Sequence, residues 1–118
     1  MKDCIFCRIA NKNIKSDIIF EDEEILVFKD INPRRPIHWL VIPKKHIDSL
    51  NELNDDKLGG KLLAIIGDLA KKHEFADKGY RVIINTKHHG GQEVDHLHIH
   101  VLAGAPAGPM ITQIESRK

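Results

Sequence analysis

Residues 96–102 read HLHIHVL, in which polar and apolar side chains alternate from His96 to Val101. Because successive side chains of a β-strand point to opposite faces, this stretch predicts a strand. The imidazoles of His96, His98 and His100 then share one face, attached about 6.6–6.8 Å apart. A half-buried strand that uses histidine only as a polar surface residue is the alternative, and the loop before the strand argues against it.

The loop that precedes this strand contains Gly90, Gly91 and Gln92. Glycine lets backbone N–H groups converge on an anion, and the Gln92 side chain adds an amide donor. A glycine pair alone indicates only a turn. Next to three imidazoles, the loop predicts a phosphate site, to which Asn85 adds a donor or acceptor if its strand pairs with the histidine strand.

Apolar periodicity in the rest of the chain predicts an α+β fold, an antiparallel five-stranded sheet with one long helix and a short N-terminal helix. The long helix covers residues 55–75, with Asn54 as its cap and one apolar stripe that must pack on the sheet. The short helix covers residues 4–10. The expected strands cover residues 18–20, 25–28, 37–42, 80–85 and 96–102.

Composition predicts one ordinary globular domain over residues 1–118. The chain has 18 Lys+Arg against 17 Asp+Glu and a formal net charge of +1, which argues against broad electrostatic binding to nucleic acid or anionic lipid. No apolar run approaches the roughly 18 residues of a membrane span. The first nine residues are too short and polar for a signal peptide. We therefore expect a cytoplasmic protein with no nucleic-acid or membrane partner.

Cys4 and Cys7 form a CxxC pair. In a reducing cytosol such a pair indicates metal ligands or a redox site before it indicates a structural disulfide. A thioredoxin-like site needs a strand before the motif, and three residues cannot supply one. Metal binding is therefore the favoured interpretation.

Four segments, in order over nearly the whole chain, resemble the histidine-triad (HIT) family of nucleotide-binding hydrolases and transferases. They are CIFCRI at 4–9, FKDINPRRPIHWLVIPKKHI at 28–47, GYRVIINT at 79–86 and GGQEVDHLHIHVLAG at 90–104. The likeness is to the Hint branch, the purine nucleoside phosphoramidases, and particularly to its bacterial members. It implies a HIT-like nucleotide-binding domain.

The resemblance implies that His98 is a nucleophile that attacks the α-phosphorus of an AMP-type substrate and forms a nucleotidyl-histidine. This role requires a neutral imidazole whose other nitrogen is protonated and held by a carbonyl. His100 and Asn85 match family residues around the phosphate, and His38 matches a histidine that supports the triad. Gly91 and Gln92 would stabilise the phosphate oxygens.

The same matching places the nucleoside beside the N-terminal helix. Asp30 would hold the ribose hydroxyls. Five apolar side chains would enclose the base: Ile5, Phe6, Ile9, Phe28 and Ile31. Apolar spacing alone fits core residues equally well, and for Ile9 both interpretations stay open.

Two positions depart from many family members. Glu93 stands where many carry a serine near the scissile bond, and an anion beside phosphate is unfavourable unless it is protonated or faces the leaving amine. We expect a changed leaving-group preference rather than a loss of activity. The C-terminal end, PAGPMITQIESRK, lacks the tryptophan-proline ending of many animal members.

The resemblance also implies a structural zinc ion held by Cys4, Cys7, His46 and His96. Two thiolates and two imidazoles close a tetrahedral site with no open position for catalysis. Free buried thiols, with His46 capping the turn after Pro43, are the alternative. Family members without the cysteines fold without metal, so zinc is predicted but not required.

Four functions stay open at this point. The first is hydrolysis of the P–N bond in purine nucleoside phosphoramidates, and the second is hydrolysis of dinucleoside polyphosphates. The third is a nucleotide-binding regulatory module with little turnover. The fourth, a metalloenzyme with the triad as ligands, is disfavoured because no suitable Asp or Glu accompanies the strand histidines.

The resemblance further implies a homodimer whose sheets join edge to edge. His73, His88 and His89 are expected to be surface residues.

Overall fold

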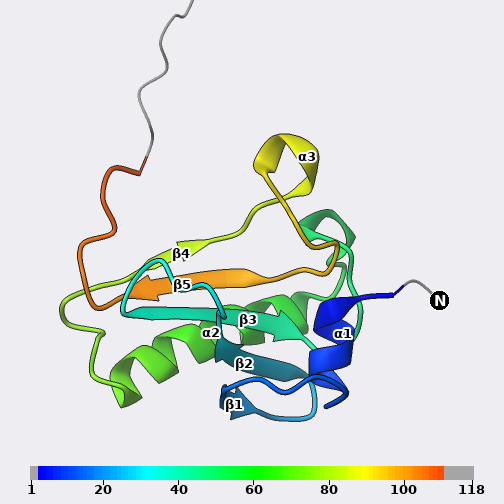
Figure 1. The fold of residues 1–118 in the computed structure, drawn as a ribbon, viewed down its shortest axis with the longest axis horizontal. Coiled ribbons are helices and arrows are strands. Elements are labelled where there is room, and N and C mark those ends of the chain that lie inside the picture. The colour runs from blue at the N-terminus through cyan, green and yellow to red at the C-terminus, as the bar shows by residue number, and fades with distance from the viewer. Residues whose placement is uncertain (1–2, 111–118) are drawn as a thin grey trace, which may run out of the picture.

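The computed structural model describes residues 3–110 and has the predicted α+β architecture (Figure 1). All neighbouring strands in its five-stranded sheet are antiparallel, in the order β1-β2-β3-β5-β4. The strands are β1 Ile18–Glu21, β2 Ile25–Lys29, β3 Ile37–Pro43, β4 Arg81–Ile83 and β5 Ile99–Ala103. The helices are α1 Ile5–Ala10, the 3-10 turn η1 Leu50–Glu52, α2 Asp56–Lys72 and α3 Lys87–Gly90.

Helix α2 covers one face of the sheet with the predicted apolar stripe, and Figure 1 shows it behind the strands. Its buried side chains pack with the apolar residues of the histidine strand, Leu97, Ile99 and Val101. The helix is shorter than expected at both ends. Its cap is Asp55 rather than Asn54, because the Asp55 carboxylate accepts the Leu58 N–H at 3.1 Å. It ends at Lys72 because the chain turns away, with Glu74 at φ 65°.

The opposite face of the sheet carries α1 and a smaller apolar cluster. Phe6 and Ile9 of α1 are buried there against Leu26 and Phe28 of β2. Strands β2 and β3 therefore send alternate side chains to two different clusters, as the period of a strand requires. His38, buried at 6% exposure, lies on the α1 face of β3 with Leu40 and Ile42.

The histidine segment keeps its predicted alternation, although β5 begins at Ile99 and not at His96. Val41 pairs with Ile99, so the same register would next oppose Leu97 to Pro43, which has no N–H to donate. The Leu97 N–H donates instead to the carbonyl of Ile47 at 2.7 Å. The regular ladder therefore ends early, while Leu97 still faces α2.

The segment before the histidines also differs from expectation. Strand β4 covers only residues 81–83, and its last pair joins Ile83 to His100, one residue from the start of β5 at Ile99. The expected loop over residues 86–95 contains the short helix α3, which projects from the sheet in Figure 1. Gly91, in the left-handed conformation at φ 79°, ends this helix. Within residues 3–110, no helix is long and apolar enough to cross a membrane.

Candidate active site

A cavity of about 590 Å³ opens on the α1 side of the sheet, where β3, β5 and β4 lie next to one another. It brings together every residue predicted to be catalytic or to bind nucleotide, except Gln92. The predicted residues that line it are Ile5, Phe6, Ile9, Phe28, Asp30, Ile31, His38, Asn85, Gly91, Glu93, His98 and His100. Ile5 and His100, which lie 95 positions apart in sequence, therefore share one site.

His98 is held in one tautomer by the backbone. Its Nδ1 lies 2.7 Å from the carbonyl oxygen of His96, and a carbonyl can only accept, so Nδ1 carries the proton. The Nε2 lone pair of the neutral imidazole is then free. The ring is 7% exposed and packs against the edge of Phe6, with the centroids 5.0 Å apart. His98 thus has the fixed, unprotonated nitrogen that a nucleophile needs.

His100 is held in the opposite tautomer through His38. The backbone N–H of Arg34 donates to Nδ1 of His38 at 3.0 Å, so the proton of neutral His38 is on Nε2. This Nε2–H donates to Nδ1 of His100 at 3.0 Å, with Asp30 Oδ2 at 3.3 Å as a competing acceptor. Neutral His100 therefore carries its proton on Nε2, where it can donate to an anionic oxygen.

Burial keeps the imidazoles of His38 and His100 uncharged near neutral pH. It lowers the pKa of His100 to about 4, assisted by the nearby rings of His98 and His38 and opposed by the carboxylates of Asp30 and Glu93. Burial also lowers the pKa of His38, and the Arg34 guanidinium lowers it further against the opposing effect of Asp30. His38 and His100 thus act through N–H groups and lone pairs rather than as cations.

The Gln92 side chain forms hydrogen bonds within the protein and does not line the cavity. Its amide nitrogen donates to the carbonyls of Asp48 and Val94 at 2.7 and 2.9 Å, and its Oε1 accepts the Lys87 N–H at 2.8 Å. The side chain therefore holds the loop after α3 against the loop after β3. Direct contact with a phosphate stays a prediction that this arrangement does not favour, whereas Gly91 does line the cavity.

Sequence reasoning missed three cationic side chains in the cavity wall, those of Arg34, Arg35 and Arg81. Arg81 could have been found, because it alternates with Asn85 along the predicted strand 80–85 and so shares its face. The two neighbouring arginines lie in the irregular segment before β3, where no periodicity indicates which way a side chain points.

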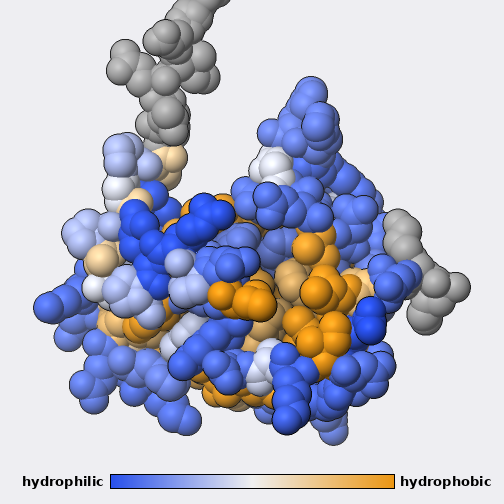
Figure 2. All heavy atoms as spheres, in the orientation of Figure 1, coloured by the Kyte–Doolittle hydropathy of each residue, from blue (hydrophilic) through white to orange (hydrophobic). Residues whose placement is uncertain are grey.

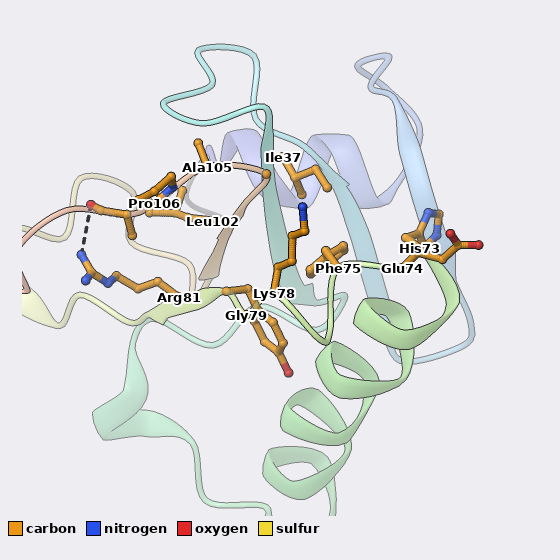
Figure 3. A pocket seen from close by; sticks show the side chains of 13 residues that line it. Ile37, His73, Glu74, Phe75, Lys78, Gly79, Arg81, Leu102, Ala105 and Pro106 are labelled. Carbon is orange, nitrogen blue, oxygen red and sulfur yellow. Dashed lines mark hydrogen bonds between the residues drawn. The ribbon is translucent and has the colours of Figure 1, made fainter.

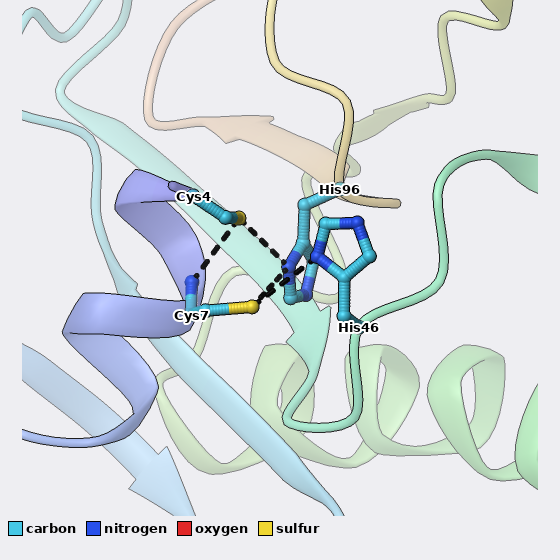
Figure 4. A group of neighbouring side chains, drawn as sticks. All are labelled: Cys4, Cys7, His46 and His96. Atoms are coloured by element: carbon cyan, nitrogen blue, oxygen red, sulfur yellow. Dashed lines mark hydrogen bonds between the residues drawn. The ribbon is translucent and has the colours of Figure 1, made fainter. Parts of the chain in front are cut away.

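The four predicted metal ligands come together at the edge of this site (Figure 4). Cys4 Sγ lies 3.3 Å from Nδ1 of His96, and Cys7 Sγ lies 3.2 Å from Nδ1 of His46. All four ligand atoms lie within 4.8 Å of one another. Cys4, Cys7, His46 and His96 are therefore close enough to bind one metal ion.

The hydrogen bonds behind the two imidazoles fit a metal site. The Nε2–H of His96 donates to the carbonyl of Pro43 at 2.8 Å, and that of His46 donates to Asp48 Oδ1 at 2.7 Å. Both Nδ1 lone pairs therefore face the sulfur atoms, which is how metal-binding histidines are oriented. Burial lowers the pKa of His96 to about 4, which keeps this ligand unprotonated at neutral pH.

The triad histidines separate into different groups. His96 lies with the cysteines, whereas His100 lies with His38 and Asp30 in a second group of potential ligands. Within residues 3–110, no group of potential ligands contains two members of the triad. This separation argues against the fourth function considered above, a metalloenzyme whose ligands are the three triad histidines.

Comparison with known proteins agrees with the fold and with the predicted family. The HIT domain profile matches residues 11–107. The purine nucleoside phosphoramidase of Escherichia coli K12 is 38% identical over 112 residues, which cover 93% of this chain and 94% of that protein.

Solved structures match equally well. A histidine triad protein from Clostridium difficile has a TM-score of 0.88 and 43% identity, over 94% of this chain and 100% of that one. A HIT family hydrolase from Legionella pneumophila has a TM-score of 0.85 and 43% identity, over 88% of this chain and 95% of that one. The predicted family is confirmed: the chain belongs to the HIT family and is a hydrolase of that family.

Proposed function

We propose that the protein cleaves the bond between the α-phosphate of an AMP-type purine nucleotide and an amine, through a nucleotidyl intermediate on His98. The observation that carries this proposal is the pair of opposite tautomers in one cavity, with a free Nε2 on His98 and an Nε2–H on His100. One nitrogen can attack phosphorus while the other stabilises the oxygens that gain charge. The Escherichia coli relative with the name purine nucleoside phosphoramidase supports the same reaction.

The cavity has suitable groups for each part of such a substrate. The apolar side chains of α1 and β2 would enclose the base, Asp30 would accept hydrogen bonds from the ribose hydroxyls, and Asn85 and Gly91 would adjoin the phosphate. Attack by His98 Nε2 forms a P–N bond to the enzyme and breaks the P–N bond to the amine, whose nitrogen takes up a proton from solvent and leaves as the neutral amine. Water then attacks phosphorus, restores the imidazole and releases the nucleoside monophosphate.

Glu93 is placed to influence the leaving group. Glu93 lines the cavity, and its carboxylate partly opposes the lowering of the His100 pKa. Its charge therefore acts on the region proposed for the phosphate. Since two anions repel, its carboxylate would face the departing amine, which can donate hydrogen bonds to it.

The C-terminal ending, which differs from that of many animal family members, falls mostly on residues 111–118. These residues lie outside those that the structure describes.

A comparison of substrates tests the proposed reaction. We expect kcat/KM for AMP joined to a fluorescent amine to exceed that for a diadenosine polyphosphate by about 100-fold or more, as transition-state discrimination permits. Liquid chromatography would follow the product AMP. A preference for the polyphosphate would indicate the second function, and tight AMP binding without turnover of either substrate would indicate a regulatory module.

We also propose that the metal is zinc and that its role is structural. Two thiolates and two imidazoles suit Zn²⁺ and leave no ligand position for substrate. When bound, the ion would fasten α1 to the loop after β3 and to the segment before β5. We propose a cytoplasmic location as well, since a reducing compartment keeps cysteines such as Cys4 and Cys7 available as metal ligands.

The homodimer is a further proposal. Strand β4 lies at the edge of the sheet, with Val82 39% exposed and Tyr80 beside it 38% exposed. A cavity of about 890 Å³ adjoins this edge, lined by Phe75, Tyr80 and Leu102 among others (Figure 3). A second copy that pairs at β4 would satisfy the open edge and cover this apolar surface.

Light scattering at micromolar concentration tests the dimer. We expect particles of about twice the 13.4 kDa of one chain. Replacing Val82 with proline removes a backbone N–H from the edge strand and should shift the population toward single chains. Particles of one chain mass alone in the unmodified protein would contradict the proposal.

A further inference from the structure

Two arginines of the cavity wall hold the segment that follows β5. Arg35 donates from Nε to the carbonyl of Pro106 and from Nη2 to that of Ala107, both at 2.9 Å. Arg81 donates to the carbonyls of Ala107 and Gly108 at 3.3 and 2.7 Å, and Figure 3 shows its guanidinium reaching this segment beside Pro106. Because both side chains share the Ala107 carbonyl, the two guanidinium groups lie close together.

The charges of these two guanidinium groups are not neutralised by their partners. Their hydrogen-bond acceptors are backbone carbonyls, and within residues 3–110 neither Arg35 nor Arg81 forms an ion pair with a carboxylate. Two cations that share one neutral oxygen repel each other, and an anion between them would relieve that repulsion. A guanidinium has five N–H donors, so each group has donors left for such an anion.

The register of the sheet places this pair beyond the triad. Ile83 pairs with His100, and Arg81 pairs with Leu102. Arg81 therefore lies on the same face of the sheet as Ile83 and His100, two residues before Ile83 in β4. That step is about 6.6–6.8 Å. Figure 2 shows apolar surface next to α1 and strongly hydrophilic surface between that patch and the C-terminal segment. The cavity therefore has an apolar end at α1 and a cationic end at Arg35 and Arg81.

We propose that Arg35 and Arg81 form a subsite for a carboxylate carried by the amine leaving group. This inference rests on the proposed function, since it assigns the leaving group of that reaction. With the base at the α1 end and the α-phosphate at His98 and His100, the leaving group extends toward the cationic end. A carboxylate there can accept charge-assisted hydrogen bonds from both guanidinium groups. The preferred substrate class is therefore AMP joined to an amine that bears a carboxylate, as in an amino acid.

A matched pair of substrates tests this subsite. AMP joined through nitrogen to 4-aminobutyrate carries the carboxylate, and AMP joined to 4-aminobutyramide is nearly the same size but has a neutral amide. We expect kcat/KM for the carboxylate substrate to be about tenfold higher in the unmodified protein, as for hydrogen bonds to a charged group. The preference should shrink as ionic strength rises, because salt screens partly exposed charges.

Variants distinguish the effect of the arginine charges on the substrate from the effect of releasing the segment that follows β5. In Arg35→Gln and Arg81→Gln the ratio of the two kcat/KM values should fall toward one, and Arg35→Lys, which keeps the charge, should retain part of it. Lys72→Gln, which removes an exposed charge at the end of α2, is the control and should keep the ratio of the unmodified protein.

Three results would overturn the proposal. Equal rates for both substrates in the unmodified protein, or arginine variants that lower both values by the same factor, would show that the arginines only anchor the C-terminal segment. In either case the phosphoramidase reaction itself would stand. Cleavage of neither substrate by the unmodified protein would instead remove the proposed function and this inference together.

Discussion

Replacing His98 with alanine is expected to lower kcat/KM for AMP–amine substrates by at least about three orders of magnitude. Among the residues that line the cavity within 3–110, His98 is the histidine whose tautomer a backbone carbonyl fixes so that a ring lone pair is free, and the variant removes it. Its neighbour His100 cannot replace it, because His38 donates to His100 Nδ1 and so leaves a proton on Nε2. The measurement is initial-rate kinetics with a fluorogenic AMP–amine.

Control variants show whether activity falls because the nucleophile is missing or because the packing around residue 98 has changed. His98 is 7% exposed and packs on Phe6, so alanine also leaves a small cavity. We therefore expect His98→Asn, which keeps a polar side chain of moderate size, to be equally inactive while it still binds AMP. His88→Ala, at an exposed position in α3, should keep normal rates. Turnover by His98→Ala at the rate of the unmodified protein would exclude His98 as the nucleophile.

Replacing Cys4 with serine is expected to abolish metal binding and to lower the free energy of unfolding by at least about 3 kcal/mol. Helix α1 has only six residues, too few to be stable by itself. Cys4 also caps it, since its Sγ accepts the Cys7 N–H at 3.3 Å. Urea unfolding and elemental analysis of protein purified without added zinc would measure both effects.

Loss of the proposed metal should also affect the active site. Helix α1 supplies Phe6 and Ile9 to the cavity wall, and the backbone carbonyl of His96, a proposed ligand, holds the proton of His98. Activity of Cys4→Ser should therefore fall, mainly through KM. The variant His89→Ala, at an exposed position outside the ligand set, serves as the matched control. One zinc per chain in Cys4→Ser, or unchanged stability without metal, would contradict the structural role.

Much of the fold followed from local sequence patterns, whereas most of the candidate site residues followed from the resemblance to the HIT family. Strict alternation at residues 96–101 gave the correct faces, because His98 lines the cavity while Leu97 and Ile99 lie under α2. The end of the regular ladder was not predictable from that pattern. It depends on Pro43, which lies opposite Leu97 only once the strands have paired.

Long-range hydrogen bonds limited the prediction of the site. The amide of Gln92 suits a phosphate by its chemistry, but in the folded chain it bonds to carbonyls of Asp48 and Val94. The tautomer of His100 depends on the Arg34 N–H, which acts through His38. Likewise, the pairing of Arg35 with Arg81 arises because both bind the chain after β5. These hydrogen bonds join residues that are far apart in sequence, and the local spacing of residue types does not indicate that they meet in the fold.

The most direct test of this mechanism is mass spectrometry of a rapidly quenched reaction with AMP–amine substrate. Because the proposed intermediate joins phosphorus to Nε2 of His98, we expect a peptide that contains His98 to gain the mass of one adenylyl group. The adduct should disappear as AMP is released and should be absent from His98→Ala. Full turnover with no adduct at any quench time, or an adduct on another residue, would contradict covalent catalysis by His98.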